Sequence, residues 1–117
     1  ASAGIAQGVR SGDRIYVSGQ VAFDRDGKLV GEGDMTAQTR QVFANIAAVL
    51  AEAGAGLNDV VKITAFITDM SQYRDYAAAR AEAFPTVLPA SATVTTPALV
   101  LPELLVEVEA IAELCNE

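Results

Sequence analysis

The sequence of 117 residues contains no histidine, no tryptophan and only one cysteine, Cys115. Without histidine the chain cannot form a Ser-His-Asp triad, has no imidazole to act as a general base, and lacks the commonest transition-metal ligand. A single cysteine cannot form an internal disulfide, which fits a reducing compartment. We therefore expect no metal and no cofactor, and any catalysis must use carboxylates, hydroxyls, backbone groups or ordered water.

Positive charge is also scarce, because 8 Lys and Arg residues face 15 Asp and Glu residues for a net charge of −7. Binding to nucleic acid needs clustered basic side chains, and anionic membranes attract them too, so neither partner is expected. No apolar run approaches the roughly 20 residues of a membrane helix. The first residues, Ala1 to Gly4, do not resemble a secretory signal. These features predict a cytoplasmic protein.

Hydrophobic residues make up 51% of the chain and aromatic residues 6%, so the core is expected to be aliphatic. The length predicts a single domain over residues 1–117. Apolar residues recur at helical spacing up to Ala53, after a cap at Asp34 or Thr36, and Gly54 is placed to end this helix. A second helix is expected over residues 72–84, and strands over residues 5–9, 14–20, 60–68, 91–96 and 104–112.

This order of elements predicts an α+β fold, a single mixed sheet with two helices on one face. Covering one face leaves the other to be explained. By alternation the uncovered face carries three apolar side chains and six polar ones, namely Val60, Phe66, Ile111, Lys62, Thr64, Thr93, Thr95, Glu107 and Glu109. Such a face is too apolar for ordinary solvated surface and too polar for a closed core, so we expect it to pack against other copies of the chain.

Four segments, covering residues 16–20, 38–46, 59–70 and 106–112, resemble the Rid/YjgF family (reactive intermediate deaminases, also called endoribonuclease L-PSP-like). They read YVSGQ, QTRQVFANI, DVVKITAFITDM and VEVEAIA. The resemblance spans nearly the whole chain. It implies a chorismate-mutase-like (YjgF) fold and a homotrimer whose sheets form a central barrel. It also implies clefts between subunits for a small-molecule ligand, and in many members hydrolysis of reactive imines and enamines.

The resemblance also implies site residues. Glu107 matches the glutamate that helps to position the attacking water, so it is the catalytic candidate. Thr93 falls where many members have cysteine or threonine, and Ser18 and Gly19 match the turn beside the cleft. The two glutamates Glu107 and Glu109 also allow a plainer interpretation, in which both are solvated or paired with Lys62.

Three substrate-binding positions depart from the deaminase pattern. Ser91, in Pro-Ala-Ser-Ala, stands where the deaminases have the arginine that holds a substrate carboxylate, while Ile5 falls near an aromatic and Ala77 near an asparagine. Serine cannot copy the planar, two-bonded fork of a guanidinium. The substitutions predict a cleft for a neutral or less polar ligand and argue against a typical 2-imino acid deaminase. The alternative is that Arg80, on the second predicted helix, swings a guanidinium into the cleft.

Two functions remain open from the sequence. One is hydrolysis of an imine, enamine or related labile nitrogen compound, with Glu107 orienting water. The other is a non-catalytic trimer that binds a metabolite or a protein. A ribonuclease activity is the least supported, because the net charge is negative and no histidine is present for acid–base cleavage.

Overall fold

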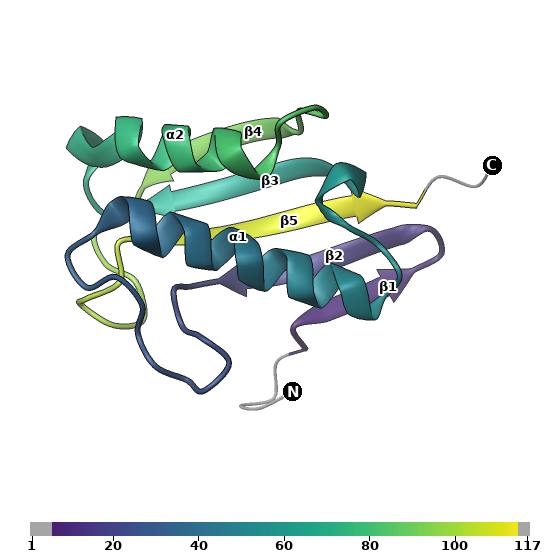
Figure 1. Ribbon diagram of the computed structural model, residues 1–117, viewed down its shortest axis with the longest axis horizontal. Helices are drawn as coiled ribbons and strands as arrows, with labels where there is room; N and C mark the ends of the chain where they lie inside the picture. Colours follow the sequence, from purple (N-terminus) through teal and green to yellow (C-terminus); the bar gives the residue numbers. More distant parts are fainter. Residues whose placement is uncertain (1–5, 115–117) are drawn as a thin grey trace.

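The computed structural model describes residues 6–114. Two helices, α1 (Met35–Glu52) and α2 (Tyr73–Ala83), lie on one face of a single sheet, with short 3₁₀ turns before β3 and before α2 (Figure 1). The strands of this sheet are β1 (Gly8–Ser11), β2 (Arg14–Gln20), β3 (Val60–Ile67), β4 (Ala90–Thr95) and β5 (Val106–Glu113). Their order is β1-β2-β5-β3-β4, and every pair is antiparallel except β3 with β4. The predicted α+β fold class is confirmed.

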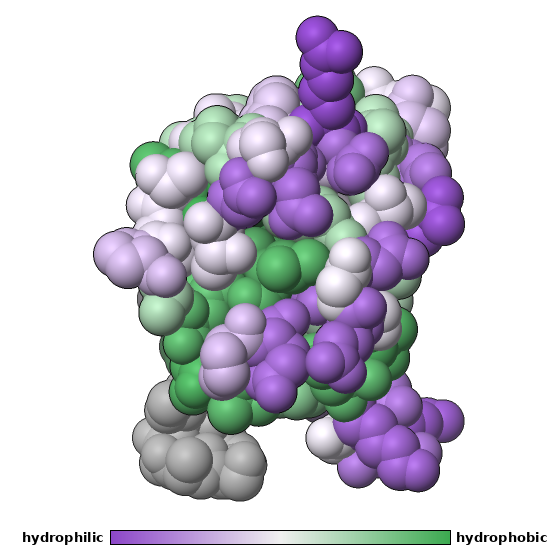
Figure 2. Space-filling model, turned by 90° about the vertical axis from the view of Figure 1, so that its left-hand side faces the viewer, coloured by the Kyte–Doolittle hydropathy of each residue, from purple (hydrophilic) through white to green (hydrophobic). Residues whose placement is uncertain are grey.

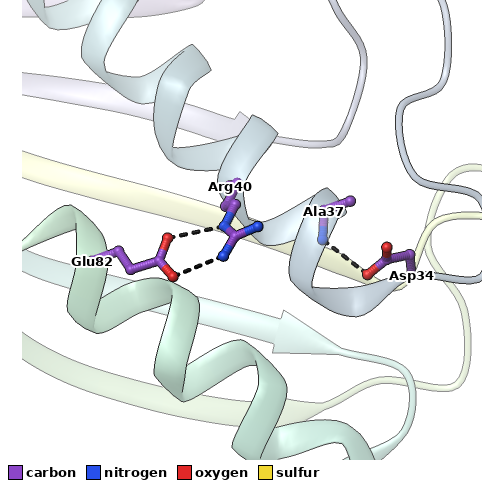
Figure 3. Close-up of polar contacts among 4 residues, drawn as sticks. All are labelled: Asp34, Ala37, Arg40 and Glu82. Atoms are coloured by element: carbon purple, nitrogen blue, oxygen red, sulfur yellow. Dashed lines mark hydrogen bonds and ion pairs between the residues drawn. The ribbon is translucent and has the colours of Figure 1, made fainter.

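Helix α1 begins and ends where its sequence predicts. The Asp34 carboxylate accepts a hydrogen bond of 3.0 Å from the Ala37 backbone N–H, one of the donors that a helix start leaves without a partner (Figure 3). Gly54, just past the helix, has φ of +78°, a conformation that glycine adopts at little cost. The apolar stripe of α1 is buried against the sheet through Val42, Phe43, Ile46 and Leu50.

The two helices are also joined to each other. Phe43 of α1 and Phe84 at the end of α2 meet edge to face, with ring centroids 5.4 Å apart. On the surface, Arg40 donates two hydrogen bonds of 2.9 Å to the two carboxylate oxygens of Glu82 (Figure 3). This two-bonded pair fixes the position of α2 beside α1, and with it the residues that α2 presents on its other side.

The structure corrects three details of the predicted strands. β1 covers Gly8–Ser11 where the sequence predicts residues 5–9. Alternation predicts Val60 on the uncovered face and Val61 under the helices, but Val60 is 2% exposed and Val61 48%. The cause is a register shift between Val60 and Lys62 that moves one residue of β3 out of the alternation.

The third correction concerns β4. Thr93 and Thr95 pair with Ala65 and Ile67, whose side chains are buried under the helices, so both threonines lie on the helix side of the sheet. Alternation predicts which residues of a strand share a face, but not which face of the sheet they take. The uncovered face is instead formed by Phe66, Thr64, Glu107, Glu109, Val94, Tyr16 and Ile111.

No helix in the described part of the chain is long and apolar enough to cross a membrane.

Candidate functional site

A groove of about 610 Å³ runs between α2 and β4, on the helix side of the sheet. Its volume falls in the range of small-molecule sites, roughly 300–1,000 Å³. Two of the predicted substrate-binding residues, Ser91 and Thr93, lie in it, and the other lining residues are Met70, Tyr73, Arg80, Ala81, Phe84, Leu88 and Pro89. The walls are mainly apolar, and the polar atoms come from a few side chains.

Arg80 places a guanidinium in this groove, beside Ser91. Its Nη1 donates to Ser91 Oγ at 3.4 Å, and its Nη2 donates to the Tyr73 hydroxyl at 3.3 Å. The guanidinium carbon also lies 5.8 Å and 5.3 Å from the ring centroids of Tyr73 and Tyr76. The expectation of a pocket without a positive charge is therefore wrong in this structure, and the alternative that Arg80 reaches the cleft is the one observed.

The helical spacing of α2 explains this position. Tyr73, Tyr76 and Arg80 recur at intervals of about one turn, so they share one side of the helix. Tyr76 is fully buried, and its hydroxyl has no hydrogen-bond partner of good geometry in residues 6–114. Burial raises the pKa of this phenol, while the nearby Arg80 opposes the rise. The spacing of Tyr73, Tyr76 and Arg80 is the feature of the sequence that could have predicted Arg80 in the groove. A comparison of the motif around Ser91 does not include these residues.

A second set of predicted residues gathers at the uncovered face. The register of β2 against β5 shifts between Val17 and Gln20, which places Ser18 and Gly19 in an irregular step beside β5. A Cβ atom on Gly19 would lie only 2.8 Å from Glu107 Cδ and closer still to Oε2. The Glu107 carboxylate therefore occupies the space where a residue other than glycine at position 19 would have its Cβ atom. Ser18 instead donates to the Ala6 carbonyl at 2.6 Å and holds the chain that precedes β1.

Glu107 is partly buried, and no cation within residues 6–114 forms an ion pair with it. Burial raises the pKa of its carboxyl, and the charge of Glu109 raises it further. The two ion pairs within residues 6–114 are Arg14–Glu113 and Arg40–Glu82, so neither involves Glu107. Lys62 does not bridge to Glu107 within the chain, because its ammonium group contacts Thr64 at 3.5 Å.

The two sets lie on opposite faces of the sheet. Glu107 pairs across the strands with Phe66 on the uncovered face, whereas Ser91 pairs with Ile63, which is buried under the helices. A single chain therefore does not bring Glu107 together with Ser91 and Thr93. The two remaining candidates add nothing to either set: Ala77 is half-buried on α2 and does not line the groove, and Ile5 lies outside the described residues.

Glu107, Ser18 and Gly19 lie near one end of the molecule. β2 ends and β5 begins at this end, which is the left-hand side of Figure 1. Seen from that side, apolar side chains gather in a hollowed centre and hydrophilic side chains surround them (Figure 2). An exposed apolar area with a polar rim is typical of a surface that meets a partner or a ligand.

A half-covered sheet with a groove of this size defines an α+β protein of the small-molecule-binding class, and comparison with known proteins specifies it. The Endoribonuclease L-PSP family matches residues 1–114. A RutC family protein from Pyrococcus abyssi is 37% identical over 107 residues, 92% of this chain and 84% of the relative. This chain belongs to the Rid/YjgF family, whose members are generally trimeric and bind small molecules.

Solved structures of related proteins agree with this assignment. A Rid family protein, YyfA from Yersinia pestis, superposes with a TM-score of 0.91 at 38% identity, over 97% of this chain and 90% of that one. A candidate endoribonuclease from Thermotoga maritima superposes with a TM-score of 0.92 at 32% identity, over 99% and 91% of the two chains. Membership supports a small-molecule-binding or deaminase-like role at the level of the family.

Proposed function

We propose that this chain is a hydrolase of imines, enamines or related labile nitrogen compounds, with its site at the contact between two subunits of a homotrimer. The groove of one subunit, with Ser91 and Thr93, would face Glu107 and Gly19 of its neighbour. Two observations support this arrangement. The sets stand on opposite faces of one sheet, and within residues 6–114 no carboxylate lines the groove and Glu107 is not among its lining residues.

The observation that carries the proposal is the state of Glu107. A carboxylate with a raised pKa is a stronger base than an ordinary one and holds a proton closer to neutral pH. As water oxygen bonds to the imine carbon, Glu107 takes a proton from that water. Glu107 passes that proton to the nitrogen, which gives a carbinolamine. Glu107 then takes the proton of the new hydroxyl and transfers it to the nitrogen as the carbon–nitrogen bond breaks, so ammonia leaves and a carbonyl product remains. No histidine is needed at any step.

The test follows the decay of 2-aminoacrylate generated in situ. Wild-type protein is expected to accelerate the decay, and Glu107→Gln, which keeps the shape but cannot accept the proton, is expected to lose about a hundredfold or more of that acceleration. Glu52→Gln is the matched control, because Glu52 is exposed at the end of α1 and lies in neither the groove nor the contacts of Glu107. No acceleration by wild type, or equal rates for wild type and Glu107→Gln, would refute the proposal.

The second candidate is a trimer that binds a metabolite without converting it. It is favoured by Ser91, which cannot orient a carboxylate as the deaminase arginine does. A ligand that stabilises the protein and is recovered unchanged, together with no acceleration of 2-aminoacrylate decay, would support this candidate over hydrolysis.

A further inference from the structure

We infer that Arg80 is the anion-binding residue of the groove and that the ligand carries a carboxylate. Arg80 would bind this carboxylate from α2, the wall of the groove that faces β4. The inference deepens the proposed function, since it names the ligand class of the same groove. It also reverses the neutral-ligand expectation drawn from Ser91.

The first argument is the missing counter-charge. Arg80 is half-buried in a concave surface, and within residues 6–114 no carboxylate lies within ion-pair distance of it. The chain has 15 acidic residues and a net charge of −7, so acceptors for a cation are abundant. Arg40 and Arg14 each have a carboxylate partner although both are exposed. A partly desolvated guanidinium that lacks such a partner within its own chain, in a groove, favours an anion that arrives with the ligand, and the proposed trimer would leave that anion to compete with the neighbour's Glu107 for Arg80.

The second argument is geometric. The rings of Tyr73 and Tyr76 lie against the guanidinium and restrict its plane. Its two contacts, to Ser91 and Tyr73, are long for hydrogen bonds at 3.4 Å and 3.3 Å and involve neutral acceptors. They leave further N–H donors free. A carboxylate that takes two parallel N–H bonds would exchange weak contacts for strong ones.

The third argument is the character of the hydroxyls around Arg80. Ser91 and Tyr73 both accept from the guanidinium, so the hydrogen of each hydroxyl stays free to be donated. An anion between them would receive bonds from Arg80, Ser91 and Tyr73 together. Serine at position 91 therefore has a role in this site, as a hydroxyl donor beside a guanidinium supplied by the helix.

The walls define the rest of the ligand. Met70, Phe84 and Leu88 line the groove, and Leu88 is 80% exposed, so an apolar chain attached to the carboxylate would cover surface that water now touches. The ligand class is a small monocarboxylate with an apolar or weakly polar body.

The test compares hexanoate with hexanamide, which has nearly the same shape and no charge. Calorimetric titration of wild-type protein is expected to show hexanoate binding at least about tenfold more tightly than hexanamide. Arg80→Gln is expected to remove this preference. Arg80→Lys keeps the charge without the planar fork and should be intermediate. Arg74→Gln is the matched control, since it removes an exposed arginine of the same helix that does not line the groove.

Equal affinities for the two ligands, or equal hexanoate affinity in wild type and Arg80→Gln, would overturn the inference. Equal weakening by Arg74→Gln would overturn it too, because general charge would then explain the preference. Amide resonances in an NMR titration of wild type give a check that needs no variant: shifts centred on the residues that line the groove support it, and shifts confined to β1 and α1 reject it.

These results separate the two proposals. Hexanoate binding that depends on Arg80, with no acceleration of 2-aminoacrylate decay, would uphold the carboxylate site and reject hydrolysis. Acceleration that depends on Glu107, with no preference for hexanoate, would do the reverse.

Discussion

Glu107 shows how one residue can be held in an unfavourable charge state by backbone geometry. The register step lies at Ser18 and Gly19, and a Cβ atom at Gly19 would displace the Glu107 carboxylate from its present position. Burial and the charge of Glu109 then disfavour ionisation. The raised pKa of Glu107 is thus a consequence of its burial and of the neighbouring charge of Glu109.

A pH prediction follows from the raised pKa of Glu107. The folded chain holds this proton more tightly than the unfolded chain, whose glutamates titrate near about 4.3. The contribution to stability is present below that value and is lost as the pH rises through the folded pKa. Urea unfolding of wild type and Glu107→Gln between about pH 4 and pH 8 should show a stability difference that shifts in favour of Glu107→Gln as the pH increases. Asp69 and Glu82, whose pKa values are lowered, are present in both proteins and cancel in the difference. A difference that does not change with pH would contradict the raised pKa.

At the residue scale, the sequence predicts which residues belong to the site better than it predicts which of them contact each other. The family pattern points to Glu107 as the catalytic residue and to Gly19 as part of the turn beside the cleft, and in the structure Gly19 lies against Glu107. The contact between Arg80 and Ser91 is harder to foresee, because it depends on the length and rotamer of a flexible side chain and on the exact rotation of α2 over β4. The sequence shows a serine at position 91, whereas the guanidinium of Arg80 beside it is visible only in three dimensions.

At the scale of elements, one glutamine joins α1 to the loops around it. Gln38 is fully buried, and its amide nitrogen donates to the carbonyls of Gly31 and Glu103 at 3.1 Å and 3.0 Å. Its amide oxygen accepts from the Leu105 N–H at 2.8 Å. The loop before α1 and the connection into β5 are therefore fixed by the same side chain, directly before Glu107.

Replacing Gln38 should be costly. Gln38→Ala leaves these backbone groups without partners in a dry place, and we expect the free energy of unfolding to fall by about 3 kcal/mol. The control is Gln41→Ala on the same helix, which removes one hydrogen bond between side chains and should have a much smaller effect. Chemical denaturation of both variants measures the difference, and equal losses would show that the Gln38 bonds do not stabilise the loops.

Elements with local signals are well predicted by the sequence. A capping aspartate and a glycine with positive φ mark α1, and alternation marks β2, so both agree closely with the structure. The reversal of Val60 and Val61 has no such signal, because a bulge is set by pairing with β5, far along the chain. The side of the sheet taken by Thr93 is likewise set by the crossing of α2 between β3 and β4.

At the scale of the molecule, the uncovered face of the sheet supports assembly. Val94 on this face is 44% exposed and stands in register with Phe66 and Glu107. Packing of three such faces into a barrel would cover these apolar side chains and bring each Glu107 to a neighbour's groove.

The matching prediction concerns mass in solution. Wild type should have about three times the chain mass of 12.2 kDa, and Val94→Asp should shift the population toward single chains, because it buries a charge in each contact. Ala48→Asp, at an exposed position of α1, is the control and should keep the wild-type mass. Light scattering after size-exclusion chromatography measures all three, and a wild type that elutes as single chains would reject the trimer.

In the proposed trimer, the placement of the groove and Glu107 on opposite faces would have a genetic consequence. When each pocket draws its anion-binding side chain from one polypeptide and its base from another, a defect is not confined to the copy that carries it. A cell with two alleles, one altered at Arg80 and the other at Glu107, would assemble mixed rings in which some pockets receive both intact halves. Two inactive gene products would then restore activity to each other.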